Sequence, residues 1–171
     1  MCSSDLRLIP MLKHLSTKDR PVAMVIPEMP WSTNTKTPRG RQGKVWQTKG
    51  DLASFMADVI EHVDVWGLMR YGSPPWDVKI VFAGYSAGGS ALSSAAQEGG
   101  LCRIRPDAVV WLDASYDGWL DKAWKGCLKN SSTHVHVLVR KWDTPHRRAK
   151  AFIKGLPDAL KPAPIYLTGT Q

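Results

Sequence analysis

The chain has 171 residues, of which 43% are hydrophobic and 22% are charged. This composition is typical of a globular domain, and it excludes a collagen-like or intrinsically disordered chain. No apolar run approaches the roughly 20 residues that a membrane-spanning helix needs, so we expect no transmembrane segment. The formal net charge of +8 raises the question of an anionic partner such as nucleic acid.

The first six residues, MCSSDL, match the string that a translated sequencing adapter gives. We therefore interpret residues 1–6 as an artefact and exclude them from reasoning about the fold. Residues 7–171 are expected to form one domain, because a chain of this length builds a single hydrophobic core.

Five short apolar runs rich in β-branched and aromatic residues predict strands. They cover residues 22–26, 78–83, 108–112, 134–139 and 163–167. Most of them lack polar alternation, which is typical of strands buried on both faces of a parallel sheet. From Asp51 onward, apolar residues recur at three- and four-residue intervals and predict an amphipathic helix. The sequence thus predicts an α/β fold, a mostly parallel sheet of about five strands with flanking helices.

Basic residues concentrate in two segments, 36–50 and 146–156. In the second segment the apolar residues fall at helical spacing, which predicts that its arginines and lysines form a solvated face. We therefore predict no nucleic-acid partner. The basic stretch 32–50 is interpreted either as a flap over a site or as a solvated loop, and both interpretations stay open.

The stretch Gly84-Tyr85-Ser86-Ala87-Gly88 fits the pattern G-x-S-x-G between a predicted strand and a predicted helix. In this context the serine occupies a strained turn that exposes its hydroxyl, and the flanking glycines let strand and helix approach each other. The backbone N–H of Ala87 would then donate a hydrogen bond to an oxyanion.

With this elbow, and with PEMPWS (27–32) and LDASYDG (112–118) after two other strands, the chain resembles the α/β-hydrolase fold. The resemblance implies that Ser86 is a nucleophile, followed along the chain by an acid and then a histidine. It implies a serine hydrolase of esters or amides, with no metal and no organic cofactor. The substrate would be a small molecule or a component of the cell envelope.

Two aspartates are candidates for the acid. Asp143 follows the run 134–139, at the usual acid position of the fold, and we favour it slightly. Its alternative is a residue at the entry of a helix. Against this alternative, Pro145 would suit the first helical position, which predicts Thr144 as the N-cap and leaves Asp143 free to point elsewhere. Asp113 follows the run 108–112 and could equally cap a turn with Ser115 or Tyr116.

No histidine follows the last predicted strand, and no strand with a glycine-rich loop precedes Asp5. We therefore expect both ends to be incomplete, with the histidine after Gln171 and the second oxyanion donor before the first residue. His146 is a weak substitute, and His134 and His136 are interpreted as surface or packing residues of a strand. The alternative is a binding domain that keeps the elbow and has lost the chemistry.

Aromatic residues cluster at the predicted carboxyl ends of the strands, where ligands bind in such sheets. They are Trp31, Tyr85, Tyr116, Trp119 and Trp142. An apolar substrate pocket and ordinary core filling explain them equally well.

Cys102 and Cys127 precede two predicted neighbouring strands, so both are expected at the amino edge of the sheet, close enough to bond. A disulfide would indicate a periplasmic or secreted protein, since such bonds rarely persist in the cytosol. Two buried free thiols are the more cautious interpretation, and they leave a cytoplasmic location open.

Overall fold

The computed structural model describes residues 24–26, 46, 49–65, 79–141, 143–156 and 165–167. The chain divides into two compact units, one of Met1–Glu28 with Met56–Val78 and one of Met29–Phe55 with Lys79–Gln171. The second unit contains the sheet and the predicted elbow. The prediction of one domain over residues 7–171 stays a prediction.

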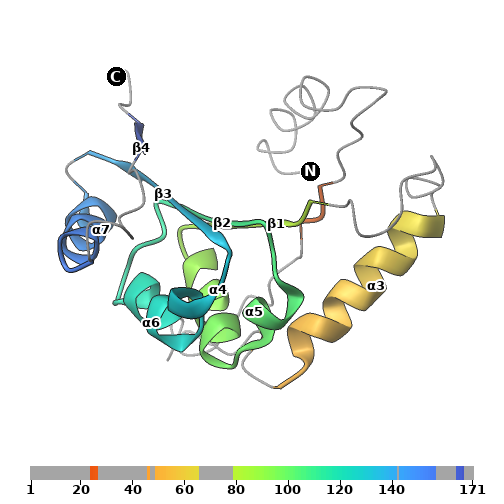
Figure 1. Cartoon of the computed structure of the whole chain (residues 1–171). Coiled ribbons are helices and arrows are strands. Elements are labelled where there is room, and N and C mark those ends of the chain that lie inside the picture. The colour runs from red at the N-terminus through yellow and green to blue at the C-terminus, as the bar shows by residue number, and fades with distance from the viewer. Residues whose placement is uncertain are drawn as a thin grey trace, which may run out of the picture. The chain divides into compact units, whose positions relative to one another are not determined.

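Helices and strands alternate along the described part of the chain (Figure 1). The helices are α3 (Asp51–Val65), α4 (Gly88–Gln97), α5 (Gly100–Ile104), α6 (Trp119–Gly126), the 3₁₀ turn η2 (Leu128–Asn130) and α7 (Thr144–Lys154). The strands are β1 (Val81–Tyr85), β2 (Ala108–Leu112), β3 (His134–Arg140) and β4 (Ile165–Leu167). The predicted α/β class is therefore confirmed.

All strand pairs of the sheet are parallel, and the strand order is β1-β2-β3-β4. Three strands have five or more residues, and β4 has only three. The described residues thus contain four strands where about five were predicted. The missing one is the run 22–26, of which residues 24–26 are described: they are exposed and lie in no strand. Hydrophobicity alone does not make a strand, because a strand also needs a neighbour to pair with.

Strand β1 covers Val81–Tyr85, whereas the predicted run covered 78–83, of which residue 78 lies outside the described residues. A side chain accounts for the start after Ile80. The Ile80 N–H donates to the Asp107 carboxylate at 2.9 Å, so it does not take part in the regular ladder. The Ile80 carbonyl in turn accepts from the Asp107 N–H at 2.8 Å. The ladder therefore starts at Val81, which pairs with Ala108.

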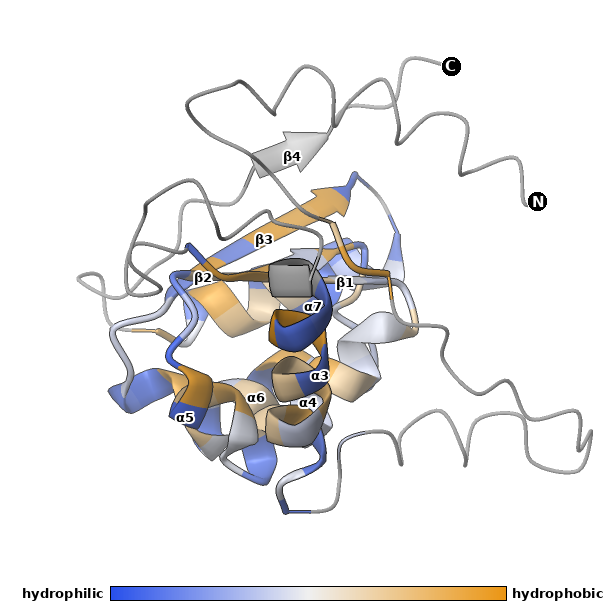
Figure 2. Cartoon of the chain, turned by 90° about the vertical axis from the view of Figure 1, so that its right-hand side faces the viewer, coloured by the Kyte–Doolittle hydropathy of each residue, from blue (hydrophilic) through white to orange (hydrophobic). Residues whose placement is uncertain are grey.

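One face of the sheet is covered by α4, α5 and α6 (Figures 1 and 2). The side chains that point into this layer from β2 and β3 are apolar and fully buried. They are Val109, Trp111, Val137 and Val139. Helix α7 packs against β3 and α6. The hydrophobic core of this unit thus lies between the strands and the helix layer.

Small residues allow the helix layer to pack closely. Helix α4 has the sequence GGSALSSAAQ, and its residues from Gly89 to Ala96 are all buried. A Cβ built on Gly126 of α6 would lie 2.8 Å from the Ala96 carbonyl oxygen of α4. Since that oxygen is backbone and cannot move aside, the two helices meet at a contact that only glycine permits.

Asp107 holds the amino edge of the sheet through two partners. Its carboxylate accepts from Ile80 N–H and forms an ion pair with Lys79 Nζ at 2.9 Å. The Lys79 hydrogen bond, followed by that from Ile80, lowers the pKa of Asp107 below its ordinary value of 3.8. A lowered pKa in the folded state means that the carboxylate stabilises the fold above pH 3.8, and that this contribution is lost as the pH falls below it.

We therefore expect Asp107→Asn to flatten the acid limb of the stability profile. Its thermal midpoint should be lower than that of the parent chain at pH 7, and the difference should shrink at pH 3. Thermal unfolding at both pH values measures this. Asp121→Asn, which removes the ion pair of Asp121 with Lys125, is the matched control. Between pH 7 and pH 3 its thermal midpoint should fall by as much as that of the parent chain. Parallel pH profiles for Asp107→Asn and the parent would contradict the assignment.

Candidate active site

The predicted elbow is present at the carboxyl end of β1. Ser86 follows the last strand residue and has the left-handed φ of 49°, which is strained for a residue with a Cβ. Its N–H donates to the Leu112 carbonyl of β2 at 3.0 Å, and its carbonyl accepts from the Gly89 N–H at 3.1 Å. The backbone therefore reverses from strand to helix within two residues and is bonded on both sides.

The glycines of the elbow have different roles. A Cβ on Gly84 would lie 2.6 Å from Leu92 Cδ1 and 3.0 Å from the Gly88 carbonyl carbon. A Cβ on Gly89 would lie 2.5 Å from the Ala114 carbonyl oxygen, whereas one on Gly88 would meet nothing within 4 Å. The prediction that Gly84 and Gly88 are both needed is thus wrong for Gly88. Strand and helix come close where Gly84 meets the Gly88 backbone, and a second close approach lies at Gly89, where α4 meets Ala114 in the loop after β2.

The first amides at the start of α4 lack acceptors among the described residues. Ala87 is the N-cap of α4, and its φ of −61° and ψ of −20° are already helical. Among the described residues, the N–H groups of Ala87 and Gly88 have no hydrogen-bond acceptor. This is the ordinary state of the first turn of a helix. The predicted oxyanion donor, Ala87, is therefore free to donate beside Ser86.

Asp113 is tied into the sheet. It has a left-handed φ of 46°, and its N–H donates to the Leu138 carbonyl at 2.8 Å. Its carboxylate accepts from the Arg140 N–H at 2.6 Å and pairs with Arg140 Nε at 3.4 Å. The alternative in which it caps a turn with Ser115 or Tyr116 is wrong, because the last residue of β3 supplies its donors.

Asp143 is the N-cap of α7, and its carbonyl accepts from the Arg147 N–H at 3.2 Å. The prediction of Thr144 as N-cap is therefore wrong: the helix starts one residue earlier, and the Thr144 hydroxyl accepts from Arg147 Nη2 instead. The Asp143 side chain makes no capping bond. Half of it is exposed, at 52%, and its contact with Arg140 Nε is long, at 3.8 Å.

Arg140 joins the two candidate acids. Its Nε lies within 4 Å of a carboxylate oxygen of both Asp113 and Asp143. Sequence reasoning missed this residue. The parallel register of β2 and β3 is what brings Arg140 to Asp113. Leu112 pairs with Leu138, so Asp113, just after β2, lies beside the end of β3 at Arg140. The carboxyl edge of the sheet therefore holds the elbow, two carboxylates and one guanidinium.

The described histidines lie on other elements than the elbow. His134 and His136 lie exposed on one face of β3, and His146 is half-buried in the first turn of α7. His62 belongs to the other compact unit, and His14 lies outside the described residues.

The aromatic residues are only partly described. Tyr85 ends β1 and is 66% exposed beside Ser86. Tyr116 in the loop after β2 and Trp119 at the start of α6 are half-buried, and their rings meet edge to face at 6.0 Å. Trp31 and Trp142, like nearly all of the basic stretch 32–50, lie outside the described residues. Whether these aromatic residues form a substrate pocket stays a prediction.

Two polar atoms behind the carboxyl edge are buried without a described partner, Trp111 Nε1 and Ser115 Oγ. A Cβ on Gly89 would lie 3.1 Å from Trp111 Cζ3, so the indole ring packs directly under the first turn of α4. An unsatisfied buried donor reduces stability and persists where the surrounding packing compensates. Close packing of Trp111 against the first turn of α4 therefore compensates for these unsatisfied polar atoms.

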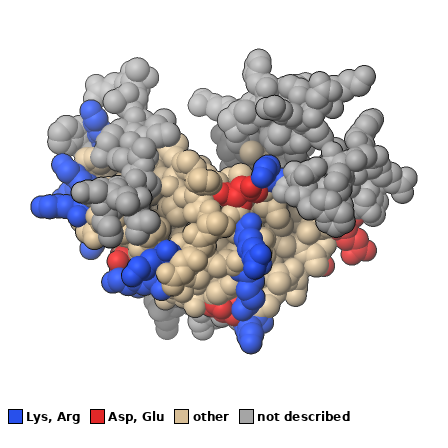
Figure 3. Space-filling model, in the orientation of Figure 1, with Lys and Arg blue, Asp and Glu red and all other residues tan. Residues whose placement is uncertain are grey.

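Positive charge gathers over α7. Its cations Arg147, Arg148, Lys150 and Lys154 are exposed, and blue atoms mark that side of the molecule in Figure 3. Its apolar residues face inward, with Ala149 buried and Phe152 in edge-to-face contact with Trp124 of α6 at 5.9 Å. The predicted solvated cationic face of this helix is confirmed.

Neither protein-family models, nor curated proteins, nor solved structures gave a match to this chain. In the described ranges, no three side chains of the metal-binding types converge. None of the helices there is both long enough and apolar enough to cross a bilayer.

The two glycines at the start of α4 allow a matched test of the elbow. Gly89→Ala is expected to lower the free energy of unfolding by about 1–3 kcal/mol, because the new Cβ collides with the Ala114 backbone. Gly88→Ala adds the same methyl group into open space and should be neutral or stabilising by up to about 1 kcal/mol. Urea unfolding of both variants measures the contrast. Equal values would show that α4 does not pack on this loop as described.

Proposed function

We propose that this chain carries the nucleophile region of a serine hydrolase that cleaves an ester or amide through a Ser86 acyl-enzyme. The observation that carries the proposal is the strained Ser86, held with φ of 49° between β1 and α4. Residues are kept in such a conformation where the surrounding structure enforces it, and they cluster at active sites. The fold proposed is that of the α/β hydrolases, in which this elbow follows a parallel strand.

The proposed chemistry uses groups at one edge of the sheet. The Ser86 hydroxyl attacks the substrate carbonyl and gives its proton to a histidine base. The Ala87 N–H, which lacks a described acceptor, donates to the developing oxyanion. The leaving alcohol or amine takes the proton from the histidine, and water then hydrolyses the acyl-enzyme. Which histidine serves as this base stays a prediction.

Of the two acids, the contacts favour Asp143. One oxygen of Asp113 accepts from the Arg140 N–H at 2.6 Å and the other forms an ion pair with Arg140 Nε at 3.4 Å, so this carboxylate is engaged in holding β2 to β3. Asp143 has one long ion pair and a half-exposed side chain, so it can accept a hydrogen bond from an imidazole. We propose Asp143 as the residue that orients the histidine and Asp113 as a structural residue.

The substrate proposed is a small molecule or an envelope component with an ester or amide bond. Tyr85 supports this, because a phenol ring 66% exposed beside the nucleophile offers an apolar surface to an acyl or aromatic group. Tyr116 and Trp119, with Trp31 and Trp142, complete the proposed set.

A fluorophosphonate probe tests the nucleophile. In the full-length natural protein that carries this sequence, we expect covalent labelling of Ser86, identified by peptide mass spectrometry, and its loss in Ser86→Ala. Ser132→Ala, which removes an exposed hydroxyl elsewhere, is the control and should label normally. If a folded protein shows no labelling of Ser86, the rival function applies, a binding domain that keeps the elbow without its chemistry.

Replacing each acid separates their roles. Asp143→Ala should slow fluorophosphonate labelling about a hundredfold or more, since the histidine loses its orienting partner. Its effect on stability should stay within about 0.5 kcal/mol, as for exposed residues in general. Asp113→Ala should instead lower the free energy of unfolding by about 1.5–3 kcal/mol, because a charge-assisted bond to the β3 backbone is lost. The reverse pattern would assign the acid to Asp113.

A further inference from the structure

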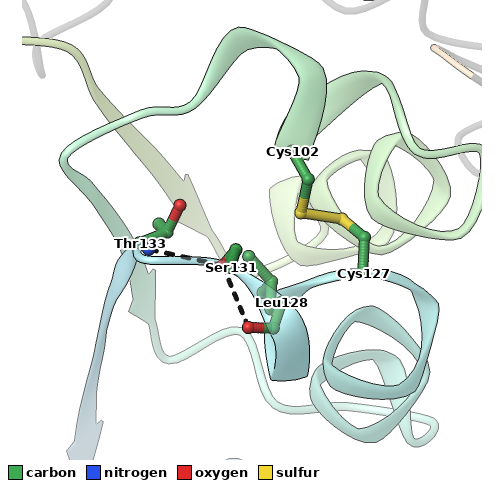
Figure 4. Close-up of a disulfide and its surroundings, with 5 residues drawn as sticks. All are labelled: Cys102, Cys127, Leu128, Ser131 and Thr133. Carbon is green, nitrogen blue, oxygen red and sulfur yellow. Dashed lines mark hydrogen bonds between the residues drawn. A yellow bond between two sulfur atoms is a disulfide. The ribbon is translucent and has the colours of Figure 1, made fainter.

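A disulfide bond joins Cys102 and Cys127 at the side of the helix layer (Figure 4). Cys102 lies in α5, and Cys127 is the C-cap of α6 and the N-cap of η2. The two residues are 25 positions apart, and the loop that the bond closes contains the whole of β2 and the loop after it. Both cysteines are half-buried.

The segments on either side of the bond are anchored in the core. Leu101 and Leu128, the neighbours of the two cysteines, are 0% and 1% exposed. Beyond Leu128, the Ser131 hydroxyl donates to the Leu128 carbonyl at 2.9 Å and accepts from the Thr133 N–H at 3.3 Å (Figure 4). The bond therefore connects two fixed points.

The cross-link also stands next to the closest contact of the helix layer. Gly126, the residue before Cys127, is the glycine whose Cβ position lies 2.8 Å from the Ala96 carbonyl oxygen of α4. Helix α5 follows α4 after a turn of two residues, so the bond ties together the two helices that flank the end of α4. Because α4 consists mainly of Gly, Ala and Ser, its own side chains bury little area to hold this layer together.

We propose that Cys102–Cys127 is a structural disulfide that braces the helix layer against α4 and is formed in an oxidising compartment outside the cytoplasm. Its formation removes two protons and two electrons from the two thiols. The acceptor would be the disulfide of a thiol–disulfide oxidoreductase, which leaves as a dithiol after exchange. A bond of this kind rarely persists among reduced cytosolic thiols. This inference goes beyond the proposed hydrolase and does not depend on it.

Thiol counting tests the bond itself. The chain has three cysteines, so the Cys2→Ser variant leaves only the proposed pair. After expression in an oxidising compartment, or refolding with glutathione disulfide, this variant should show no free thiol under denaturing, non-reducing conditions. It should show two after reduction. Two free thiols in the folded protein after oxidative refolding would overturn the proposal.

The brace is tested by comparing the oxidised and reduced protein, and the Cys102→Ser/Cys127→Ser double variant stands for the reduced form. Loss of the bond should lower the thermal midpoint by on the order of 5–10 °C, because the closed loop regains entropy in the unfolded chain. Amide hydrogen exchange should speed up over α4, residues 88–97, while α7, residues 144–154, stays unchanged as the internal control. An unchanged midpoint, or faster exchange confined to residues 100–104 and 126–130, would overturn the brace.

Discussion

The local structure of the candidate site depends on one constraint, the left-handed turn at Ser86. A residue with a Cβ adopts this conformation at a cost of roughly 1–2 kcal/mol, so the neighbouring chain has to enforce it. Two backbone hydrogen bonds do so, one from Ser86 to Leu112 of β2 and one from Gly89 back to Ser86. The contact of Gly89 with Ala114 allows α4 to start where those bonds require it. The serine hydroxyl and the first free amides of α4 thus share one edge of the sheet.

A carboxylate at each end of β2 supports this arrangement. Asp107, just before β2, accepts from the Ile80 N–H ahead of β1. Asp113, just after β2, accepts from the Arg140 N–H at the end of β3. Each aspartate thus accepts from a backbone N–H that has no carbonyl acceptor at the end of the strand ladder. Each also forms an ion pair, Asp107 with Lys79 and Asp113 with Arg140. The central strand is in this way held to β1 at one edge and to β3 at the other.

The two ends of α4 are stabilised by different means. At its start, backbone hydrogen bonds and a glycine contact hold the elbow. At its end, another glycine contact, between Gly126 and Ala96, lies beside the disulfide. Since the buried residues of α4 are mostly small, the helix provides close approach rather than a large apolar surface. A covalent link between its neighbours is a physically reasonable complement to such a layer.

Much of the fold could be predicted from local patterns. The run 108–112 became β2 at the predicted bounds, 134–139 became β3 with one residue more, and the apolar spacing after Asp51 became α3. The turn G-x-S-x-G was also predicted, because its glycines and serine are neighbours in the chain. The run 22–26 failed at residues 24–26, since a strand requires a pairing partner that hydrophobicity does not specify.

By itself, the sequence determined the α/β class, the position of the elbow and the cationic face of α7, because these depend on residues a few positions apart. Only the tertiary structure decided that Gly89 rather than Gly88 makes the close contact. It likewise decided that Arg140 pairs more closely with Asp113 than with Asp143, at 3.4 Å against 3.8 Å. The bond between Cys102 and Cys127 was also decided at this level. These contacts join residues about 25 positions apart, and they follow from strand register and helix packing, which local patterns do not specify.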